Sequence, residues 1–160
     1  MVRKARVFMK NLSNKNEVSA GFAIISNGKI LLGKSSGNNK KRSWGVFKGK
    51  VEGGEEIIDG AIRELYEESG LNILESEYLQ KCTSTVPVAE YSMYGGKKKV
   101  YIYLINDNKG ILKDFNFYCD PNEDGLVEVS EFKWFDKDEA EMNIFWSQIC
   151  VIDKLSHLMY

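Results

Sequence analysis

The chain is organised around one stretch, Gly49-Lys50-Val51-Glu52-Gly53-Gly54-Glu55-Glu56-Ile57-Ile58-Asp59-Gly60-Ala61-Ile62-Arg63-Glu64-Leu65-Tyr66-Glu67-Glu68-Ser69-Gly70-Leu71. A glycine-rich loop opens this stretch, a helix fills it, and Gly70 is placed to end the helix in the left-handed conformation. Apolar residues at helical spacing predict that one face of the helix packs against a core. This apolar stripe comprises Ile58, Ala61, Ile62 and Leu65.

The helix carries its negative charge on a different face. Glu64, Glu67 and Glu68 are spaced i, i+3 and i+4, so their side chains lie together. Like charges at this spacing cost a helix about 0.2–0.5 kcal/mol per pair. A divalent cation reverses that repulsion, and Mg²⁺ prefers carboxylate oxygens while keeping several waters that a phosphate can replace. The spacing therefore predicts a magnesium site on this face.

The whole stretch resembles the Nudix box, the signature of the Nudix hydrolase family. The family pattern is Gly, five residues, Glu, seven residues, and then Arg-Glu-apolar-any-Glu-Glu-any-Gly-apolar. Every fixed position of the pattern is present. A solvated, glutamate-rich helix face is the plainer alternative, but it explains neither the glycines nor the arginine. The matching residues are Gly49, Glu55, Arg63, Glu64, Leu65, Glu67, Glu68, Gly70 and Leu71.

The resemblance implies a reaction and a set of metal ligands. Nudix enzymes hydrolyse a nucleoside diphosphate linked to another moiety, and water attacks one phosphorus of the pyrophosphate. By resemblance, Glu64 and Glu68 bind Mg²⁺ directly, Glu67 shares metals or waters, and the backbone carbonyl of Lys48 is a further ligand. Mn²⁺ is expected to substitute for Mg²⁺.

The resemblance also implies supporting residues around the metal site. Glu55 and Arg63 are expected to pair and to brace the loop against the helix, while Gly49 and Gly70 serve the loop and the helix cap. The predicted catalytic residues are Glu67, Glu68, Glu64, Glu55 and Arg63.

The general base is left open by the sequence. Some relatives use a glutamate of the box, and others use an acidic residue on a distant loop. Glu123, Asp124 and Glu128 are the candidates on such a loop here, although an ordinary acidic surface loop is the plainer interpretation of each.

The substrate is indicated only weakly. In the family, a Pro about sixteen residues after the box favours ADP-ribose, and a Tyr at about that distance favours dinucleoside polyphosphates. Pro87 follows Leu71 by sixteen residues and Tyr91 follows it by twenty, which gives a mild preference for ADP-ribose-like nucleotides. Dinucleoside polyphosphates and capped or triphosphorylated RNA 5′ ends stay open. So does a Nudix-fold module that binds a nucleotide without cleaving it.

Two basic clusters are the predicted substrate contacts. Lys41 and Arg42 lie in a polar loop, where they either meet a phosphate at the mouth of a site or are simply solvated. Lys98 and Lys99 precede an apolar run, where they either steer a polyphosphate or keep an adhesive strand soluble.

Length and composition favour one domain over residues 1–160. The hydrophobic fraction is 43% and the charged fraction 28%, as in ordinary globular proteins, and the net charge of −1 gives no general attraction to nucleic acid or membrane. No apolar run reaches transmembrane length. Cys82, Cys119 and Cys150 are widely spaced, which favours a reducing compartment and a cytoplasmic location. Formation of a homodimer is left open.

Hydrophobic patterning predicts strands on both sides of the box helix. Asn27-Gly28 indicates a two-residue hairpin between strands at 20–26 and 29–33. Together these elements favour an α/β fold, the Nudix-type α/β/α sandwich with a mixed β-sheet. Further strands are expected at 7–9, 44–47, 78–88, 100–105 (central) and 129–135, with a loop at 91–96. A capping box at 136–139 predicts the start of a C-terminal helix. The core-facing stripe of this helix comprises Met142, Phe145, Trp146, Ile149 and Ile152.

Overall fold

The computed structural model describes residues 16–37 and 41–160, so the strand predicted at 7–9 lies outside the described part. A seven-stranded mixed sheet forms the middle layer of the fold. Its strands are β1 (Glu17–Ser26), β2 (Lys29–Ser35), β3 (Trp44–Gly45), β4 (Phe47–Lys50), β5 (Ala89–Met93), β6 (Lys98–Asp107) and β7 (Val129–Phe135). Its α-helices are α2 (Ile57–Ser69), α3 (Glu77–Cys82), α4 (Lys137–Asn143) and α5 (Ile149–Leu155).

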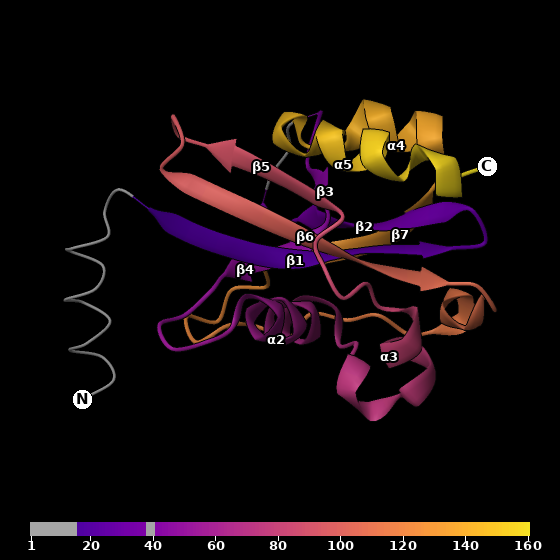
Figure 1. Cartoon of the computed structure of the whole chain (residues 1–160), viewed down its shortest axis with the longest axis horizontal. Helices are drawn as coiled ribbons and strands as arrows, with labels where there is room; N and C mark the ends of the chain where they lie inside the picture. Colours follow the sequence, from indigo (N-terminus) through magenta and orange to yellow (C-terminus); the bar gives the residue numbers. More distant parts are fainter. Residues whose placement is uncertain (1–15, 38–40) are drawn as a thin grey trace.

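Helices cover both faces of the sheet, which confirms the predicted α/β/α arrangement. Figure 1 shows α2 and α3 on one face and α4 and α5 on the other. Alternate residues of β1 serve the two cores: Phe22 and Ile24 pack with the α2 side, whereas Ala23 and Ile25 pack with the α4–α5 side. A strand buried on both faces explains the nearly continuous apolar run in its sequence.

Strand β1 is the centre of the sheet topology. It pairs in parallel with β6 along its whole length, as expected for a central strand at 100–105. On its other edge, its C-terminal half pairs with β2 and its N-terminal half with β4, both antiparallel. The hairpin between β1 and β2 is confirmed, because Asn27 (φ 51°) and Gly28 (φ 74°) both take the left-handed conformation that such a turn requires.

The strand predicted at 44–47 is divided between two partners. Trp44–Gly45 pairs with β2, and Phe47–Lys50 pairs with β1, so the chain crosses from one strand to the other at Val46. This crossing fills the place where β1 and β2 separate. It also brings the start of the glycine-rich loop to the end of α2.

The segment between the box and β6 corrects two predictions. The strand predicted at 78–88 is wrong, because Ser76 caps the helix Glu77–Cys82 by accepting a hydrogen bond from the Leu79 amide. The loop predicted at 91–96 is wrong in its first half, because β5 continues to Met93 and only the turn that follows is irregular.

The single C-terminal helix is also wrong. The capping box at Asp136 is confirmed, but α4 ends at Asn143 and Ile144 is extended. The extended backbone lets the Phe145 amide bind the carbonyl of Trp44, which ties this break to β3. As a result, Met142 and Trp146 are 61% and 72% exposed instead of facing the core.

Candidate active site

The box helix α2 places its apolar and acidic faces as the spacing predicts. Ala61 and Leu65 are fully buried against the sheet. Gly70 ends the helix with φ 76°, and its amide binds the carbonyl of Tyr66, which confirms the predicted left-handed cap. Because the apolar stripe is anchored, the glutamates of the opposite face are held at the start of the glycine-rich loop.

Gly49 lets the loop pass directly over the helix. A Cβ atom at this position would overlap the carboxylate of Glu64, so the close approach requires glycine. The side chain of Glu64 is therefore confined between the loop backbone and α2, where only 12% of it is exposed.

Arg63 joins the loop and the helix, as the predicted pairing with Glu55 requires. Its Nε and Nη2 atoms donate to Oε2 and Oε1 of Glu55 at 2.9 and 3.1 Å. Its Nη1 donates to Glu64 at 2.9 Å and to Glu67 at 3.3 Å, and Nη2 also binds the carbonyl of Lys50 at 2.8 Å. The hydrogen bond to Glu55 raises the pKa of Arg63, which keeps the guanidinium charged.

Glu68 is the most enclosed carboxyl of the cluster. Its Oε1 accepts a 2.8 Å hydrogen bond from the backbone amide of Lys48. Burial, and then repulsion from Glu64, raise the pKa of Glu68 well above its ordinary value. Burial also raises the pKa of Glu64, although Arg63 opposes this shift. Two neighbouring acids thus resist carrying their negative charges together.

Glu128, just before β7, extends the acidic cluster. Its charge contributes to the raised pKa of both Glu64 and Glu68, and it lines the same pocket as Glu68. Glu123 and Asp124 lie instead in an exposed turn that Asn122 closes through its side-chain oxygen. Of the three acidic loop residues singled out in the sequence, the structure brings Glu128 to the box.

The donor set fits a divalent cation by its chemistry. Among residues 16–37 and 41–160, no three acidic, histidine or cysteine side chains converge as a ready-made metal site. Glu64 and Glu67 both turn toward Arg63 instead. Glu64 and Glu68 nevertheless supply hard oxygen donors whose mutual repulsion a bound Mg²⁺ would relieve. The predicted carbonyl ligand at Lys48 lies on the same wall, and its role stays a prediction.

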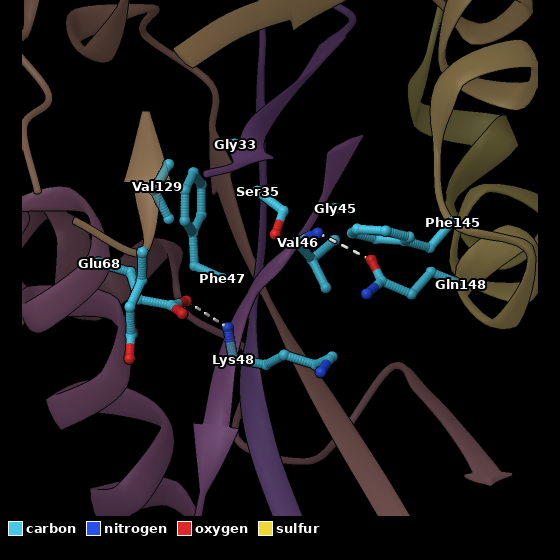
Figure 2. A pocket seen from close by; sticks show the side chains of 11 residues that line it. Gly33, Ser35, Gly45, Val46, Phe47, Lys48, Glu68, Val129, Phe145 and Gln148 are labelled. Carbon is cyan, nitrogen blue, oxygen red and sulfur yellow. Dashed lines mark hydrogen bonds between the residues drawn. The ribbon is translucent and has the colours of Figure 1, made fainter. Parts of the chain in front are cut away.

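A pocket opens beside this cluster, where the chain crosses from β2 to β1. Figure 2 shows Glu68 on one side and Phe145 and Gln148 on the other, with the crossing strand between them. The apolar patterning had placed Phe145 in the core and gave no sign of Gln148. Only the break between α4 and α5 brings both residues here. The lining residues are Gly33, Ser35, Gly45, Val46, Phe47, Lys48, Glu68, Glu128, Val129, Phe145 and Gln148.

The predicted basic contacts are dispersed. Arg42 donates to the carbonyls of Glu141 and Ile144 at 2.8 and 3.0 Å and stacks on the exposed ring of Trp146, so it caps α4. Lys41 is exposed in the preceding loop. Their contact with substrate stays a prediction.

Lys98 and Lys99 begin β6, which pairs with β1, the strand that lies between β6 and β4. Burial lowers the pKa of Lys48, and the charge of Lys98 lowers it further. Of these two lysines, Lys48 lines the pocket. Lys99 lies 3.8 Å from Glu90 on the neighbouring strand β5. A role in substrate binding stays a prediction for Lys98 and Lys99 as well.

Comparison with known proteins identifies the family signature over nearly the whole chain. The family model described as NUDIX domain matches residues 15–155. The m7GpppN-mRNA hydrolase dcap-2 of Caenorhabditis elegans is 26% identical over 87% of this chain, which spans 17% of that protein. The m7GpppN-mRNA hydrolase NUDT17 of Bos taurus is 31% identical over 77% of this chain and 43% of its own length. The oxidized purine nucleoside triphosphate hydrolase of Danio rerio is 27% identical over 78% of this chain and 69% of its own length.

Solved structures show the same fold at low sequence identity. The E. coli ORF135 protein superposes with a TM-score of 0.63 and 20% identity over 90% of this chain and 91% of its own. An Ap4A hydrolase of C. elegans superposes with a TM-score of 0.59 and 18% sequence identity, over 87% of this chain and 96% of its own. The third structure is a bifunctional NMN adenylyltransferase/ADP ribose pyrophosphatase from Francisella tularensis, complexed with AMP and a Mn ion. It superposes with a TM-score of 0.61 and 18% sequence identity, over 98% of this chain and 47% of its own.

Proposed function

The chain belongs to the NUDIX domain family, and we propose that it is a Mg²⁺-dependent hydrolase of a nucleoside diphosphate linked to another moiety. The observation that carries this proposal is the group of three carboxylates, Glu64, Glu68 and Glu128, beside one pocket. Their mutual repulsion suits a site that receives a cation together with a pyrophosphate.

The residues of the box have different roles in the proposed reaction. A divalent cation, when bound, neutralises pyrophosphate charge and activates water. Glu64 and Glu68, with Glu67, would hold it, and Mn²⁺ would serve as a substitute. Glu55 acts through Arg63, whose guanidinium orients Glu64 and Glu67.

We assign the general base to Glu128. It is exposed and lines the pocket, so it can accept a proton from water there, and its charge acts on both Glu64 and Glu68. Glu123 and Asp124 lie in a turn whose hydrogen bonds are closed within itself.

The substrate is a nucleotide derivative, and two finer candidates have support. The spacing of Pro87 from the box favours ADP-ribose-like compounds. Two relatives named m7GpppN-mRNA hydrolases favour RNA 5′ ends instead. A panel of ADP-ribose, diadenosine tetraphosphate, nucleoside triphosphates and capped RNA, each with Mg²⁺, tests the proposal. Binding without any hydrolysis across this panel would leave only a nucleotide-binding module.

The domain organisation and the location of the protein are proposed from its sequence. Residues 1–160 act as one domain, and the spacing of the cysteines favours the cytoplasm. In the part of the chain that the structure describes, no helix is long and apolar enough to cross a membrane.

A further inference from the structure

The chain between β6 and β7 crosses the α2 side of the sheet before it reaches Glu128 (Figure 1). We call residues 115–128 of this crossing the strap. Phe117 and Cys119 of the strap pack in the same core as α2, whereas residues 120–128 are exposed. The strap is therefore anchored where it begins and exposed where it ends, and its last residue is the one that we assign as general base.

Tyr118 joins the strap to the end of α2. Its backbone amide donates a 3.0 Å hydrogen bond to the carbonyl of Ser69. Its ring lies so close to Gly70 that a Cβ atom there would be 2.5 Å from Cε1 and 2.8 Å from Cδ1 of the ring. Gly70 thus provides the left-handed cap and also leaves room for the tyrosine. Because Ser69 directly follows Glu68, this contact adjoins the most enclosed carboxyl of the site.

A row of aromatic rings ties the strap to the strands beside the site. Phe117 stacks on Phe132 of β7 with ring centroids 5.9 Å apart, and Phe132 stacks on Phe47 of β4 at 5.8 Å, separations at which aromatic pairs attract. Phe47 precedes Lys48, whose amide binds Glu68. These contacts form a closed ring that begins at Glu68, passes through β4, β7 and the strap, and returns to the end of α2.

Cys119 extends this anchorage to Glu128. Burial raises the pKa of the Cys119 thiol, and hydrogen bonding with the backbone of Val129 and of Glu128 opposes the shift. The strap therefore folds back, so that the residue after Tyr118 meets the residue that carries the base. From the other side, the carbonyl of Glu128 accepts a 3.0 Å hydrogen bond from the amide of Ser36, just after β2. The backbone of Glu128 is thus held between β2 and the anchored part of the strap.

We propose that Tyr118 is a positioning residue, which holds Glu128 beside Glu68 by fastening the strap to the end of α2. The proposal rests on the assignment of Glu128 as general base in the proposed hydrolysis. A base must lie within hydrogen-bonding reach of the water that it deprotonates. A displacement of about 1 Å can cost on the order of 10²-fold in rate. Tyr118 therefore acts on the reaction through Glu128 and not by contact with the substrate.

Tyr118→Ala removes the ring and keeps the backbone amide. With Mg²⁺ and a substrate from the panel, kcat should fall about 10–100-fold while KM changes little, because the base is displaced and the groups that bind substrate are not. Tyr118→Phe keeps the ring on Gly70 and should have the wild-type kcat. Tyr66→Ala is the matched control and should also have the wild-type kcat, since Tyr66 is a half-exposed tyrosine of α2 about one turn before Gly70.

A double variant separates positioning from a general loss of structure. If Tyr118 acts through Glu128, adding Tyr118→Ala to Glu128→Gln should lower kcat by less than about twofold more. Two effects that multiply would mean that Tyr118 acts independently, and the proposal would be wrong. A wild-type kcat in folded Tyr118→Ala would also overturn it, and so would a wild-type kcat in Glu128→Gln.

Amide hydrogen exchange without metal tests the anchorage apart from the reaction. Measured by NMR, the amides at positions 118, 119, 128 and 129 should exchange faster in Tyr118→Ala than in wild type, and at the wild-type rate in Tyr66→Ala. Unchanged exchange in Tyr118→Ala would overturn the anchorage.

A wild-type protein that cleaves no member of the panel would contradict the proposed hydrolysis itself, and with it the catalytic role of Tyr118. Faster exchange in Tyr118→Ala would then still establish the anchorage, so the two failures are distinguishable. If Tyr118→Ala does not fold, Tyr118→Leu takes its place in every comparison, because leucine keeps apolar volume but cannot lie flat on Gly70. A folded Tyr118→Leu protein with wild-type kcat and exchange would overturn the proposal.

Discussion

The backbone amide of Lys48 donates a 2.8 Å hydrogen bond to Oε1 of Glu68. This bond ties β4 to the last turn of α2 and fixes one wall of the pocket. It stabilises the charged form of Glu68, but burial and the charge of Glu64 outweigh it and raise the pKa. The folded protein therefore holds an acid that disfavours its own ionisation until a cation arrives.

Glu68→Gln should separate stability from catalysis. Because the folded-state pKa of Glu68 is raised, the folded protein binds more protons than the unfolded chain at pH values between the ordinary glutamate pKa and the raised one. Its free energy of unfolding therefore falls as the pH rises through the interval between the two pKa values, and stays lowered above it. Glutamine keeps the acceptor for Lys48 and removes the charge. Without metal, the variant should be at least as stable as wild type at pH about 7, while turnover falls severely.

Urea unfolding from pH about 4 to 8 measures this difference. The difference in the free energy of unfolding between Glu68→Gln and wild type should increase as the pH rises and should become small at acid pH. Glu67→Gln is the companion variant, since its side chain is half-exposed and should change turnover with little effect on this pH profile. A Glu68→Gln protein that is clearly less stable than wild type at neutral pH would mark the carboxylate as structural.

Gly49→Ala should damage the site, whereas Gly53→Ala should not. A methyl group at 49 overlaps the Glu64 carboxylate, but a methyl group at 53 meets nothing within 4 Å. Gly53→Ala restricts the unfolded chain and should leave stability unchanged or raise it by about 0.4–1 kcal/mol. Gly49→Ala must displace Glu64 or the loop, so both turnover and melting temperature should fall. Equal behaviour of the two variants would remove the close approach as the reason for Gly49.

The box could be predicted from the sequence because its signals are local. The apolar stripe, Gly70 and the spacing of Glu64 from Gly49 all act within one loop and one helix, and the structure places them accordingly. The pairing of Arg63 with Glu55 likewise joins neighbouring turns of chain.

The opposite wall could not be predicted, because it depends on distant contacts. Ile144 leaves the helical conformation so that Phe145 can bind Trp44, a strand residue far away in the chain. That break directs Gln148 into the pocket, and no periodicity in the C-terminal sequence predicts the break. The helix at Glu77–Cys82 was missed for a different reason: its apolar residues suit a strand, and the Ser76 cap decided the outcome.

Glu128→Gln should lower turnover through the loss of a base. Glu128 lines the pocket beside Glu68, whereas Glu123 lies in a turn outside the pocket lining, so Glu123→Gln is the matched control. We expect kcat to fall by about 10²–10⁴-fold for Glu128→Gln, with KM nearly unchanged. Steady-state kinetics with saturating Mg²⁺ measure both values. Similar rates for the two variants would return the role of base to a glutamate of the box.

Mg²⁺ should stabilise the protein by binding its folded state. At a concentration about 100 times the dissociation constant, the gain is about 2.7 kcal/mol. Thermal denaturation with Mg²⁺, with Mn²⁺ and with excess chelator measures it, and sodium chloride at equal ionic strength controls for screening. The shift should be lost in Glu64→Gln, and hydrolysis should stop in chelator. Full activity in excess chelator would rule out a metal-dependent reaction.

The ion pair between Glu55 and Arg63 should appear as coupling in a double-mutant cycle. The two side chains are 18% and 27% exposed and share two hydrogen bonds. Glu55→Gln and Arg63→Ala should each reduce turnover and stability, and the double variant should cost less than their sum by about 1–3 kcal/mol. The exposed pair Lys50–Glu17, 3.3 Å apart, is the control and should couple by less than about 1 kcal/mol. Strict additivity at Glu55 and Arg63 would mean that they act independently, and Glu55 would then compete with Glu128 for the role of general base.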